Sequence, residues 1–209
     1  MYRWLKQIKL VVYVIMLDNF FNKISNGITL TEADKTIFRQ YVIVKKLRKR
    51  QFLLQEGEIC KSVAFVNKGM LRSYLMDEKN NERIIQFAPE GWFISDLSSF
   101  ITNDFSNLNI DAIENSELVL ISQAAHIRLE KIIPEFFRFN YMQYRSAYIA
   151  LQKRLTNMVT LSAEEKYIKL LSVYPDITQR VPQHMIASYL GLKPETLSRV
   201  RKKLIAKKN

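Results

Sequence analysis

The sequence contains a single cysteine, Cys60, among its 209 residues. One thiol excludes a disulfide bond within the chain, and it also excludes a zinc site or an iron–sulfur cluster held by several cysteines of one chain. Because such low cysteine usage is typical of a reducing compartment, we expect the protein in the cytoplasm.

Histidine is almost as scarce, since His126 and His184 are the only two. We interpret both as residues of helix surfaces. Two isolated histidines cannot form the metal centre of a cupin-type β-sandwich enzyme, which needs several histidines and a carboxylate. A glycine-rich phosphate loop, a nucleophile elbow and a Cys–His pair are also missing. We therefore expect that the protein is not an enzyme and binds neither a metal nor a cofactor. The sequence leaves open whether it binds a small-molecule effector.

Acidic residues are few: 20 Asp and Glu stand against 32 Lys and Arg, a formal net charge of +12. Such a balance indicates a polyanionic partner or a membrane surface. The apolar run from Leu10 to Leu17 follows Arg3, Lys6 and Lys9 in the manner of a secretion signal. It is too short to span a bilayer, and no small-residue cleavage site follows it. We expect neither secretion nor membrane insertion, and Met16 is an alternative start of the native chain.

Glycine and proline number only five each, so the few glycines mark turns. Gly57, Gly69 and Gly91 separate short apolar or alternating runs between Val42 and about Ser122, a pattern typical of antiparallel strands. Asp77–Glu82 has the polar composition of a hairpin tip. This region is predicted to be a β-sandwich, jelly roll or small barrel. Its clearest strands are Val63–Val66, Leu71–Leu75, Ile84–Phe87, Leu108–Ile113 and Leu118–Ile121.

A helix is predicted over Gln123–Lys131, ended by the steric effect of Pro134, and a longer one from Pro134 to about Thr160. In the longer helix, large apolar residues advance by four and three positions in turn, a heptad spacing typical of packing against a partner helix. We expect homodimerisation through this seam, which consists of Phe137, Tyr141, Tyr144, Tyr148, Leu151, Leu155 and Met158. The chain's own sheet is expected to cover a second face, formed by Phe136, Phe139, Ala147 and Ala150.

The last quarter of the chain, after a helix expected over Ser162–Val173, has the pattern of two helices joined by a tight turn. Gly191 stands at the turn, where glycine adopts a left-handed conformation without steric cost, and Pro194 sets φ for the next helix. From Lys193 to Asn209 the chain holds seven Lys or Arg and one Glu, a net +6. A helix-turn-helix with this charge indicates DNA binding. The two helices would pack through Ile186, Ala187, Leu190, Leu197 and Val200.

This order of sandwich, seam helix and helix-turn-helix resembles the Crp/Fnr family of bacterial transcription regulators over about residues 20–206. PETLSRVRKKL at Pro194–Leu204 looks like the family's recognition helix, and GWFISD at Gly91–Asp96 looks like its effector-pocket turn. The resemblance implies a homodimer that binds a pseudo-palindromic site on double-stranded DNA. It also implies an α+β fold in three parts: a cyclic-nucleotide-binding-like antiparallel sandwich or jelly roll at 16–133, a dimerisation helix at 134–160, and a winged-type helix-turn-helix domain at 161–209.

Position by position, the resemblance implies that Glu195 and Arg199 contact base edges, with Ser198 between them on the same face. Arginine can donate twice to guanine and glutamate can accept from cytosine, although the helix dipole also explains a glutamate in a first turn. RNA polymerase is a further candidate partner. A second basic cluster could touch flanking DNA or a polymerase surface, although such charges also protect a strand edge; it consists of Lys45, Lys46, Arg48, Lys49 and Arg50. The residues suited to phosphate contacts are Lys193, Thr196, Arg201 and Lys202.

The sequence departs from the family at the effector pocket. Cyclic-nucleotide-binding relatives carry a Gly-Glu pair in the pocket turn and, ten residues after the glutamate, an Arg-Ser pair that clamps the cyclic phosphate. Here the pairs are Ser95-Asp96 and Ser106-Asn107, which lack the charged donor that an enclosed phosphate needs. We expect an effector other than cyclic AMP, a redox signal or no signal. The candidate pocket residues are Arg72, Tyr74, Phe87, Trp92, Ser95, Asp96, Ser106, Asn107 and Tyr144.

Charge alone leaves one rival open, a protein that binds nucleic acid or a membrane surface without sequence preference. Glu195 in the basic helix disfavours this rival, because an acidic side chain weakens the attraction of phosphates unless it contacts a base. A selection of DNA sequences separates the two hypotheses, since a regulator enriches one palindrome.

Overall fold

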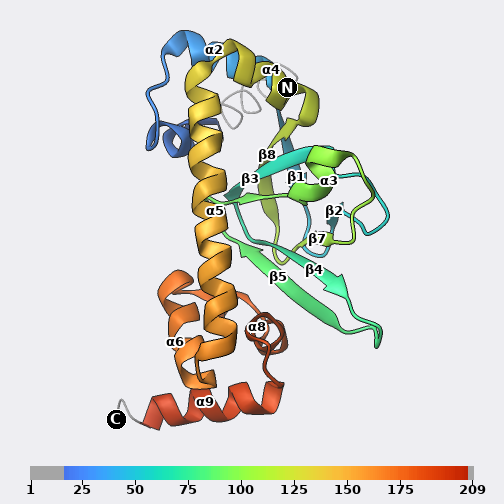
Figure 1. Ribbon diagram of the computed structural model, residues 1–209, viewed down its shortest axis with the longest axis vertical. Helices are drawn as coiled ribbons and strands as arrows, with labels where there is room; N and C mark the ends of the chain where they lie inside the picture. The colour runs from blue at the N-terminus through green and yellow to red at the C-terminus, as the bar shows by residue number, and fades with distance from the viewer. Residues whose placement is uncertain (1–16, 207–209) are drawn as a thin grey trace, which may run out of the picture. The chain divides into compact units, whose positions relative to one another are not determined.

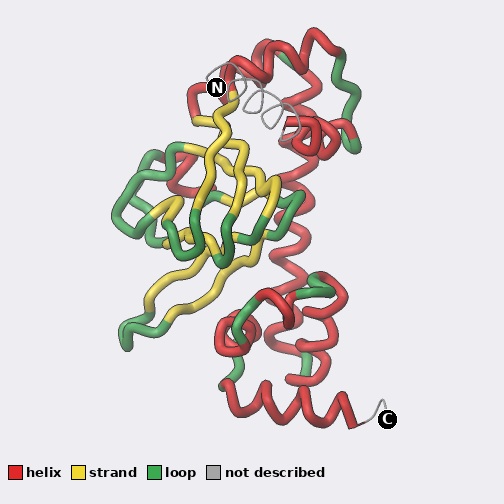
Figure 2. Tube along the Cα trace, turned by 180° about the vertical axis from the view of Figure 1, so that it is seen from behind, coloured by secondary structure: helices red, strands yellow, loops and turns green. Residues whose placement is uncertain are grey.

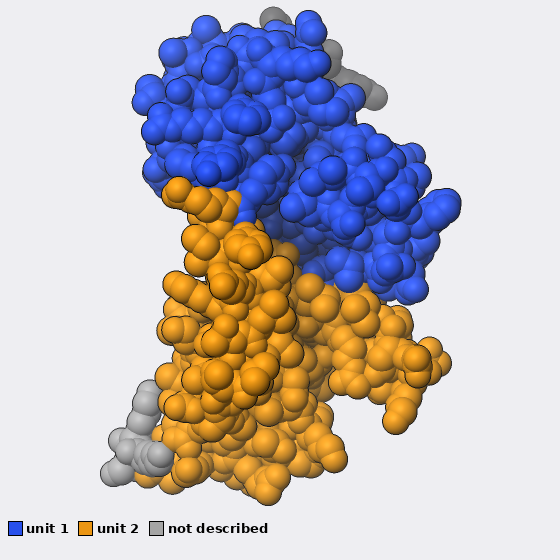
Figure 3. Space-filling view, viewed as in Figure 1, with its two compact units in different colours: residues 1–73, 87–144 blue, residues 74–86, 145–209 orange. Residues whose placement is uncertain are grey.

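The computed structural model describes residues 17–206. Arg3, Lys6, Lys9 and Met16 lie outside this range, so the interpretation of the N-terminus stays a prediction. Residues 17–25 are helical. The chain divides into two compact units, one of residues 1–73 and 87–144 and the other of residues 74–86 and 145–209 (Figure 3).

Short strands between residues 42 and 122 form two four-stranded sheets, in the order β1-β8-β3-β6 and β2-β7-β4-β5 (Figures 1 and 2). In the first sheet, β1, β3 and β6 pair antiparallel with their neighbours. The predicted sandwich is confirmed, while the short strands β2 and β6 give no clear sequence signal. The strands are β1 (Val42–Leu47), β2 (Phe52–Leu54), β3 (Ser62–Lys68), β4 (Leu71–Met76), β5 (Glu82–Ala88), β6 (Phe93–Ile94), β7 (Asn109–Ala112) and β8 (Ser116–Ser122).

The turn between β3 and β4 depends on Gly69, which has a φ of +91°. A Cβ at this position would lie 2.7 Å from the carbonyl oxygen of Asn115 and 2.8 Å from the Cα of Ser116. Gly57 also has a positive φ, +83°, but an added Cβ there meets nothing within 4 Å. A side chain would strain the backbone at both positions, but only at Gly69 would it also overlap with neighbouring atoms.

Replacing Gly69 by alanine is expected to destabilise the protein by about 3 kcal/mol, because the left-handed strain and the overlap with backbone atoms add. Gly57→Ala is the matched control and should lower the free energy of unfolding by only about 1 kcal/mol. Urea denaturation followed by circular dichroism measures both. Equal effects of the two substitutions would show that the turn yields to the added methyl group.

A layer of helices packs beside the first sheet around a cluster of aromatic side chains. It comprises residues 17–25, α2 (Glu32–Tyr41), α4 (Gln123–Ile132) and the first turns of α5 (Pro134–Thr160). The rings of Phe38 and Phe136 meet edge to face with centroids 5.0 Å apart, a favourable geometry for aromatic pairs. This layer fixes the start of α5 against the sheet (Figure 1).

Helix α5 has the bounds that the sequence predicts, Pro134–Thr160. Its second face is buried only over the first two turns, where Phe136 and Phe139 join the aromatic cluster. The prediction was wrong for Ala147 and Ala150, which are exposed, because the helical layer that covers this face reaches only its first turns.

The second unit contains the C-terminal helices α6 (Ala163–Val173), α7 (Ile177–Arg180), α8 (Gln183–Leu190) and α9 (Pro194–Ala206). Ser162 and Glu165 form a capping box that begins α6 where the sequence predicts it. Between residues 163 and 206 the structure contains helices and no strand. The winged-type prediction implies strands that form a wing. Residues 163–206 contain no such strands.

Candidate functional site

The turn between α8 and α9 has the geometry of a helix-turn-helix. Gly191 lies in the left-handed region at φ 67° and ψ 30°, and its N–H donates to the last turn of α8. The N–H of Leu192 donates to the carbonyl oxygen of Ala187 at 2.9 Å, which completes the cap. Pro194 is the first residue of α9. The roles predicted for Gly191 and Pro194 are confirmed.

The two helices pack through the residues that the sequence predicts. Ile186 and Ala187 of α8 are each 1% exposed, and Leu197 of α9 is fully buried. Leu190 is buried and Val200 is half-buried. Because the apolar face of α9 is fixed against α8, its polar side chains are held on the opposite face.

That opposite face carries the predicted base-contacting residues. Glu195 and Arg199 are exposed and lie one helical turn apart, and Ser198 beside them is half-buried. Lys202 extends the same face by three positions and is exposed, as is Lys193 just before the helix. This surface therefore combines one carboxylate and one guanidinium with flanking ammonium groups.

Two of the predicted phosphate-contacting residues have partners inside the helix pair. Arg201 donates to the side-chain oxygen of Gln183 in α8 at 3.1 Å, so it ties the two helices together. The hydroxyl of Thr196 lies 3.5 Å from Nη2 of Arg199. Their assignment to phosphates stays a prediction, and Arg201 has a structural role that the sequence did not indicate.

The seam of α5 consists of large apolar side chains that are exposed in the single chain. Their exposed fractions run from 38% to 68%, although helices usually bury residues of this kind. The exposed seam residues are Phe137, Tyr141, Tyr144, Tyr148, Leu151, Leu155 and Met158. Such a continuous apolar ridge marks an interaction surface.

The carboxylate of Asp96 in the predicted effector turn accepts hydrogen bonds from neighbouring residues. Asp96 caps α3 (Leu97–Thr102) by accepting from the backbone N–H groups of Ser98 and Ser99. Its second oxygen accepts from the hydroxyl of Ser106 at 2.7 Å. Ser106 is buried, whereas Asn107 is exposed. The structure thus joins Asp96 and Ser106 directly, ten residues apart in the chain.

Residues 44–131 match the family of cyclic nucleotide-binding domains. This segment is therefore similar to a cyclic nucleotide-binding domain. No curated protein sequence matches the chain. None of the helices between residues 17 and 206 has the length and apolar character needed to cross a membrane.

Several solved structures are similar over most of the chain. FixK2 from Bradyrhizobium japonicum has a TM-score of 0.69 at 18% identity, covering 79% of this chain and 85% of its own. A putative regulator of the Crp/Fnr family from Eubacterium rectale has a TM-score of 0.66 at 15% identity, covering 85% of each chain. The c-di-GMP responsive regulator CLP from Xanthomonas campestris has a TM-score of 0.66 at 17% identity, covering 85% of this chain and 93% of its own. The chain therefore has the fold of Crp/Fnr transcription regulators.

Within residues 44–131, Arg72 is paired with an acid that the sequence did not single out. Its Nε and Nη2 donate to the two carboxylate oxygens of Asp111 at 2.7 and 3.0 Å. The side chains of Arg72 and Asp111 are only 7% and 8% exposed. The guanidinium of this candidate pocket residue is thus engaged by a carboxylate of the neighbouring strand β7.

The other candidate pocket residues differ in exposure. Tyr74 and Phe87 are buried, at 6% and 0% exposed, whereas Trp92 and Tyr144 are more than a third exposed. Partial burial raises the pKa of the Tyr144 hydroxyl, and the charge of Glu130 adds to that effect. Whether these residues hold a ligand stays a prediction.

A cavity of about 490 Å³ lies elsewhere within residues 44–131. It shares no residue with the candidate pocket, and Cys60 is part of its wall. Burial raises the pKa of the Cys60 thiol, which keeps it protonated. The cavity is lined by Lys45, Leu53, Leu54, Glu58, Ile59, Cys60, Lys61, Ser62, Phe105, Ile110 and Leu120.

The interpretation of His126 as a residue of a helix surface was wrong. His184 is exposed on α8, but His126 is 7% exposed and its ring contacts those of Phe100 and Phe136. Burial lowers the pKa of His126, and the carboxylate of Glu130, 3.7 Å away, opposes the shift. The aromatic core overrides the usual preference of histidine for the surface.

Proposed function

We propose that the protein is a sequence-specific transcription regulator of the Crp/Fnr type that acts in the cytoplasm as a homodimer on a pseudo-palindromic DNA site. The observation that carries this proposal is the outward face of α9, where Glu195, Arg199 and Lys202 are exposed while Leu197 is buried behind them. A guanidinium and a carboxylate on a rigid helix can read base edges, and flanking lysines can hold phosphates.

The homodimer is supported by the exposed seam of α5. Burying one large apolar side chain contributes roughly 1.5 to 3 kcal/mol, so pairing of two seams would bury a substantial apolar ridge from each chain. A homodimer places two recognition helices on one duplex, with half-sites about one helical turn apart. RNA polymerase is a further partner within this proposal.

The proposed effector is not cyclic AMP. The carboxylate of Asp96 already accepts the donors of the turn, from Ser98, Ser99 and Ser106. A cyclic phosphate would bring a second negative charge to this carboxylate, and the neutral Asn107 supplies no compensating cation. The proposal includes no catalytic step and no cofactor.

The test starts with a selection of DNA sequences, followed by two substitutions on α9. Arg199→Ala should lower the preference for the selected base pair by about 1 to 3 kcal/mol, while much of the salt-dependent affinity remains. Lys202→Ala is the matched control and should weaken binding to all sequences similarly, with a salt slope smaller by about one. Fluorescence anisotropy on selected and scrambled duplexes measures both. Equal losses on every sequence for both variants would support a nonspecific binder instead.

A further inference from the structure

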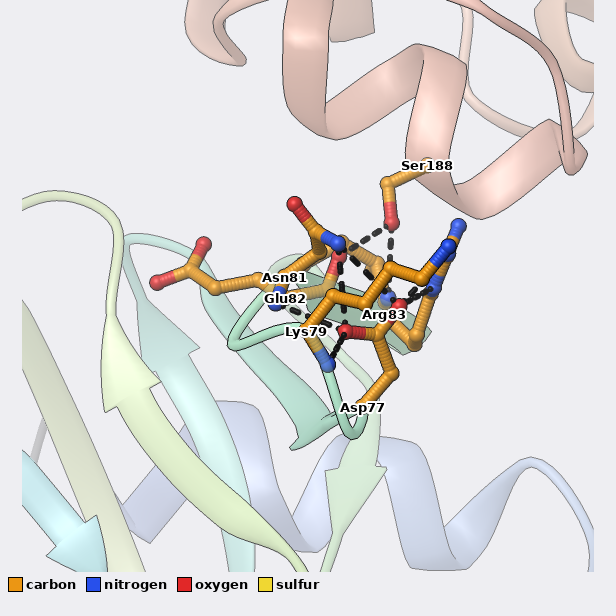
Figure 4. A network of polar contacts seen from close by, with 7 residues as sticks. Asp77, Lys79, Asn81, Glu82, Arg83 and Ser188 are labelled. Atoms are coloured by element: carbon orange, nitrogen blue, oxygen red, sulfur yellow. Dashed lines mark hydrogen bonds and ion pairs between the residues drawn. The ribbon is translucent and has the colours of Figure 1, made fainter.

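The hairpin of β4 and β5 has a tip that is held together by one carboxylate. Asp77 accepts from the backbone N–H groups of Lys79 and Asn81, both at 2.9 Å, and from Nε of Arg83 at 2.8 Å. These contacts, above all the N–H of Asn81, lower the pKa of Asp77 to about 2, so the side chain is ionised at neutral pH. The tip, predicted from sequence as a polar turn, is therefore held by a network of hydrogen bonds around one carboxylate (Figure 4).

The same hairpin contacts the first helix of the helix-turn-helix through Ser188. The hydroxyl of Ser188 donates to the carbonyl oxygen of Glu82 at 2.6 Å and accepts from the N–H of Ile84 at 3.0 Å. Figure 4 shows this hydroxyl directed from its helix at the backbone of the hairpin. Strand β5 is at the edge of its sheet, so its outer polar groups need partners other than a strand.

Arg154 of α5 adds a second contact to the same place. Its guanidinium donates to the carbonyl oxygens of Ile85 and Ile84 on the hairpin and of Tyr189 on α8. It also lies over the ring of Tyr189, 4.1 Å from the centroid, a cation–π geometry. One side chain thus bridges α5, the hairpin and α8, and residues 74–86 form one compact unit with residues 145–209.

We propose that Ser188 and Arg154 are positioning residues that fasten the helix-turn-helix to the β4–β5 hairpin, so that the hairpin and the recognition helix α9 move as one body. This inference rests on the proposed DNA-binding function. Within this compact unit, Ser188 joins the hairpin to α8, and Arg154 joins both of them to helix α5. Fixing the orientation of each helix-turn-helix lowers the conformational entropy that is lost when two of them bind one palindrome.

The contact itself is tested by amide exchange of the free protein, measured residue by residue with NMR. Ser188→Ala removes the acceptor of the Ile84 N–H and should speed exchange of that amide by about tenfold. Ser188→Thr keeps the hydroxyl and should retain the protection. Ser172→Ala is a control, because the Ser172 hydroxyl bonds within α6. Unchanged exchange at Ile84 in Ser188→Ala overturns the proposed contact.

The positioning role is tested on two duplexes, the selected palindrome and a single half-site. Ser188→Ala and Arg154→Gln should each weaken binding to the palindrome by about tenfold. Binding to the half-site should stay within about twofold of the wild type, because a single helix-turn-helix can bind without a fixed orientation relative to a second one. Ser188→Thr should restore palindrome binding. Equal losses on both duplexes, or tighter binding to the palindrome, overturn the positioning role. If the wild-type chain selects no palindrome, the proposed function fails, whereas the exchange measurement still decides whether the contact exists.

Discussion

A Leu151→Asp/Leu155→Asp double variant is expected to be monomeric and to bind the selected palindrome at least about 100-fold more weakly than the wild-type chain. Both leucines lie on the seam of α5 and are more than half exposed, at 54% and 58%. Pairing two seams would bury four carboxylates against each other and against apolar side chains, which excludes the dimer. Linking two binding modules is worth roughly 10² to 10⁴ in avidity, so a monomer loses that factor.

Analytical ultracentrifugation and anisotropy on the palindrome measure the two effects separately. The single variants Lys153→Glu and Lys153→Asp on the same helix are the controls. Each changes the charge of the chain by −2, as the double variant does, but Lys153 lies off the seam at an exposed position. These controls should remain dimeric. A double variant that stays dimeric, or a monomer that binds the palindrome as tightly as the wild type, would contradict the assignment of the seam.

The sequence predicted α5 and the helix-turn-helix well because their signals are local. Pro134 marks the start of α5, and the four-three spacing marks its exposed ridge. Gly191 and Pro194 mark the turn: Gly191 has the predicted left-handed conformation, and Pro194 is the first residue of α9. Each signal lies within a few residues of the feature that it predicts, so single-chain periodicity and turn chemistry suffice.

Contacts between distant segments could not be predicted in the same way. Arg72 and Asp111 are 39 positions apart, and Ser188 and Ile84 are 104 apart. Which residues of two strands face each other depends on strand order and register, and neither has a signature in the spacing along one chain. The capping of α3 by Asp96 could have been found, since an aspartate before a short helix is a common N-cap.

His126 shows the limit of residue preferences. Its helix buries Ala125, His126 and Leu129, and the periodicity of the helix places these three on one face. A surface assignment followed from the polarity of histidine alone, whereas the packing of Phe100 and Phe136 around the ring decides its position. Helix periodicity was the better guide at this residue.

The largest effect on stability is expected from Asp111→Asn, which should lower the free energy of unfolding by about 3 to 5 kcal/mol. The substitution keeps the size of the side chain but removes its charge, and the buried guanidinium of Arg72 then lacks the carboxylate that compensates it. Urea denaturation measures the change. Glu117→Gln is the matched control in the same domain, because Glu117 pairs with the exposed Lys46, and surface pairs of this kind contribute less than about 1 kcal/mol.

A double variant separates the charge from the packing. Arg72→Met/Asp111→Leu removes both ionic groups and fills similar space with apolar atoms, so we expect it to recover most of the stability that Asp111→Asn loses. If the double variant is as unstable as Asp111→Asn, packing rather than an uncompensated charge causes the loss. If Asp111→Asn is no less stable than Glu117→Gln, the guanidinium of Arg72 does not depend on Asp111 for its compensation.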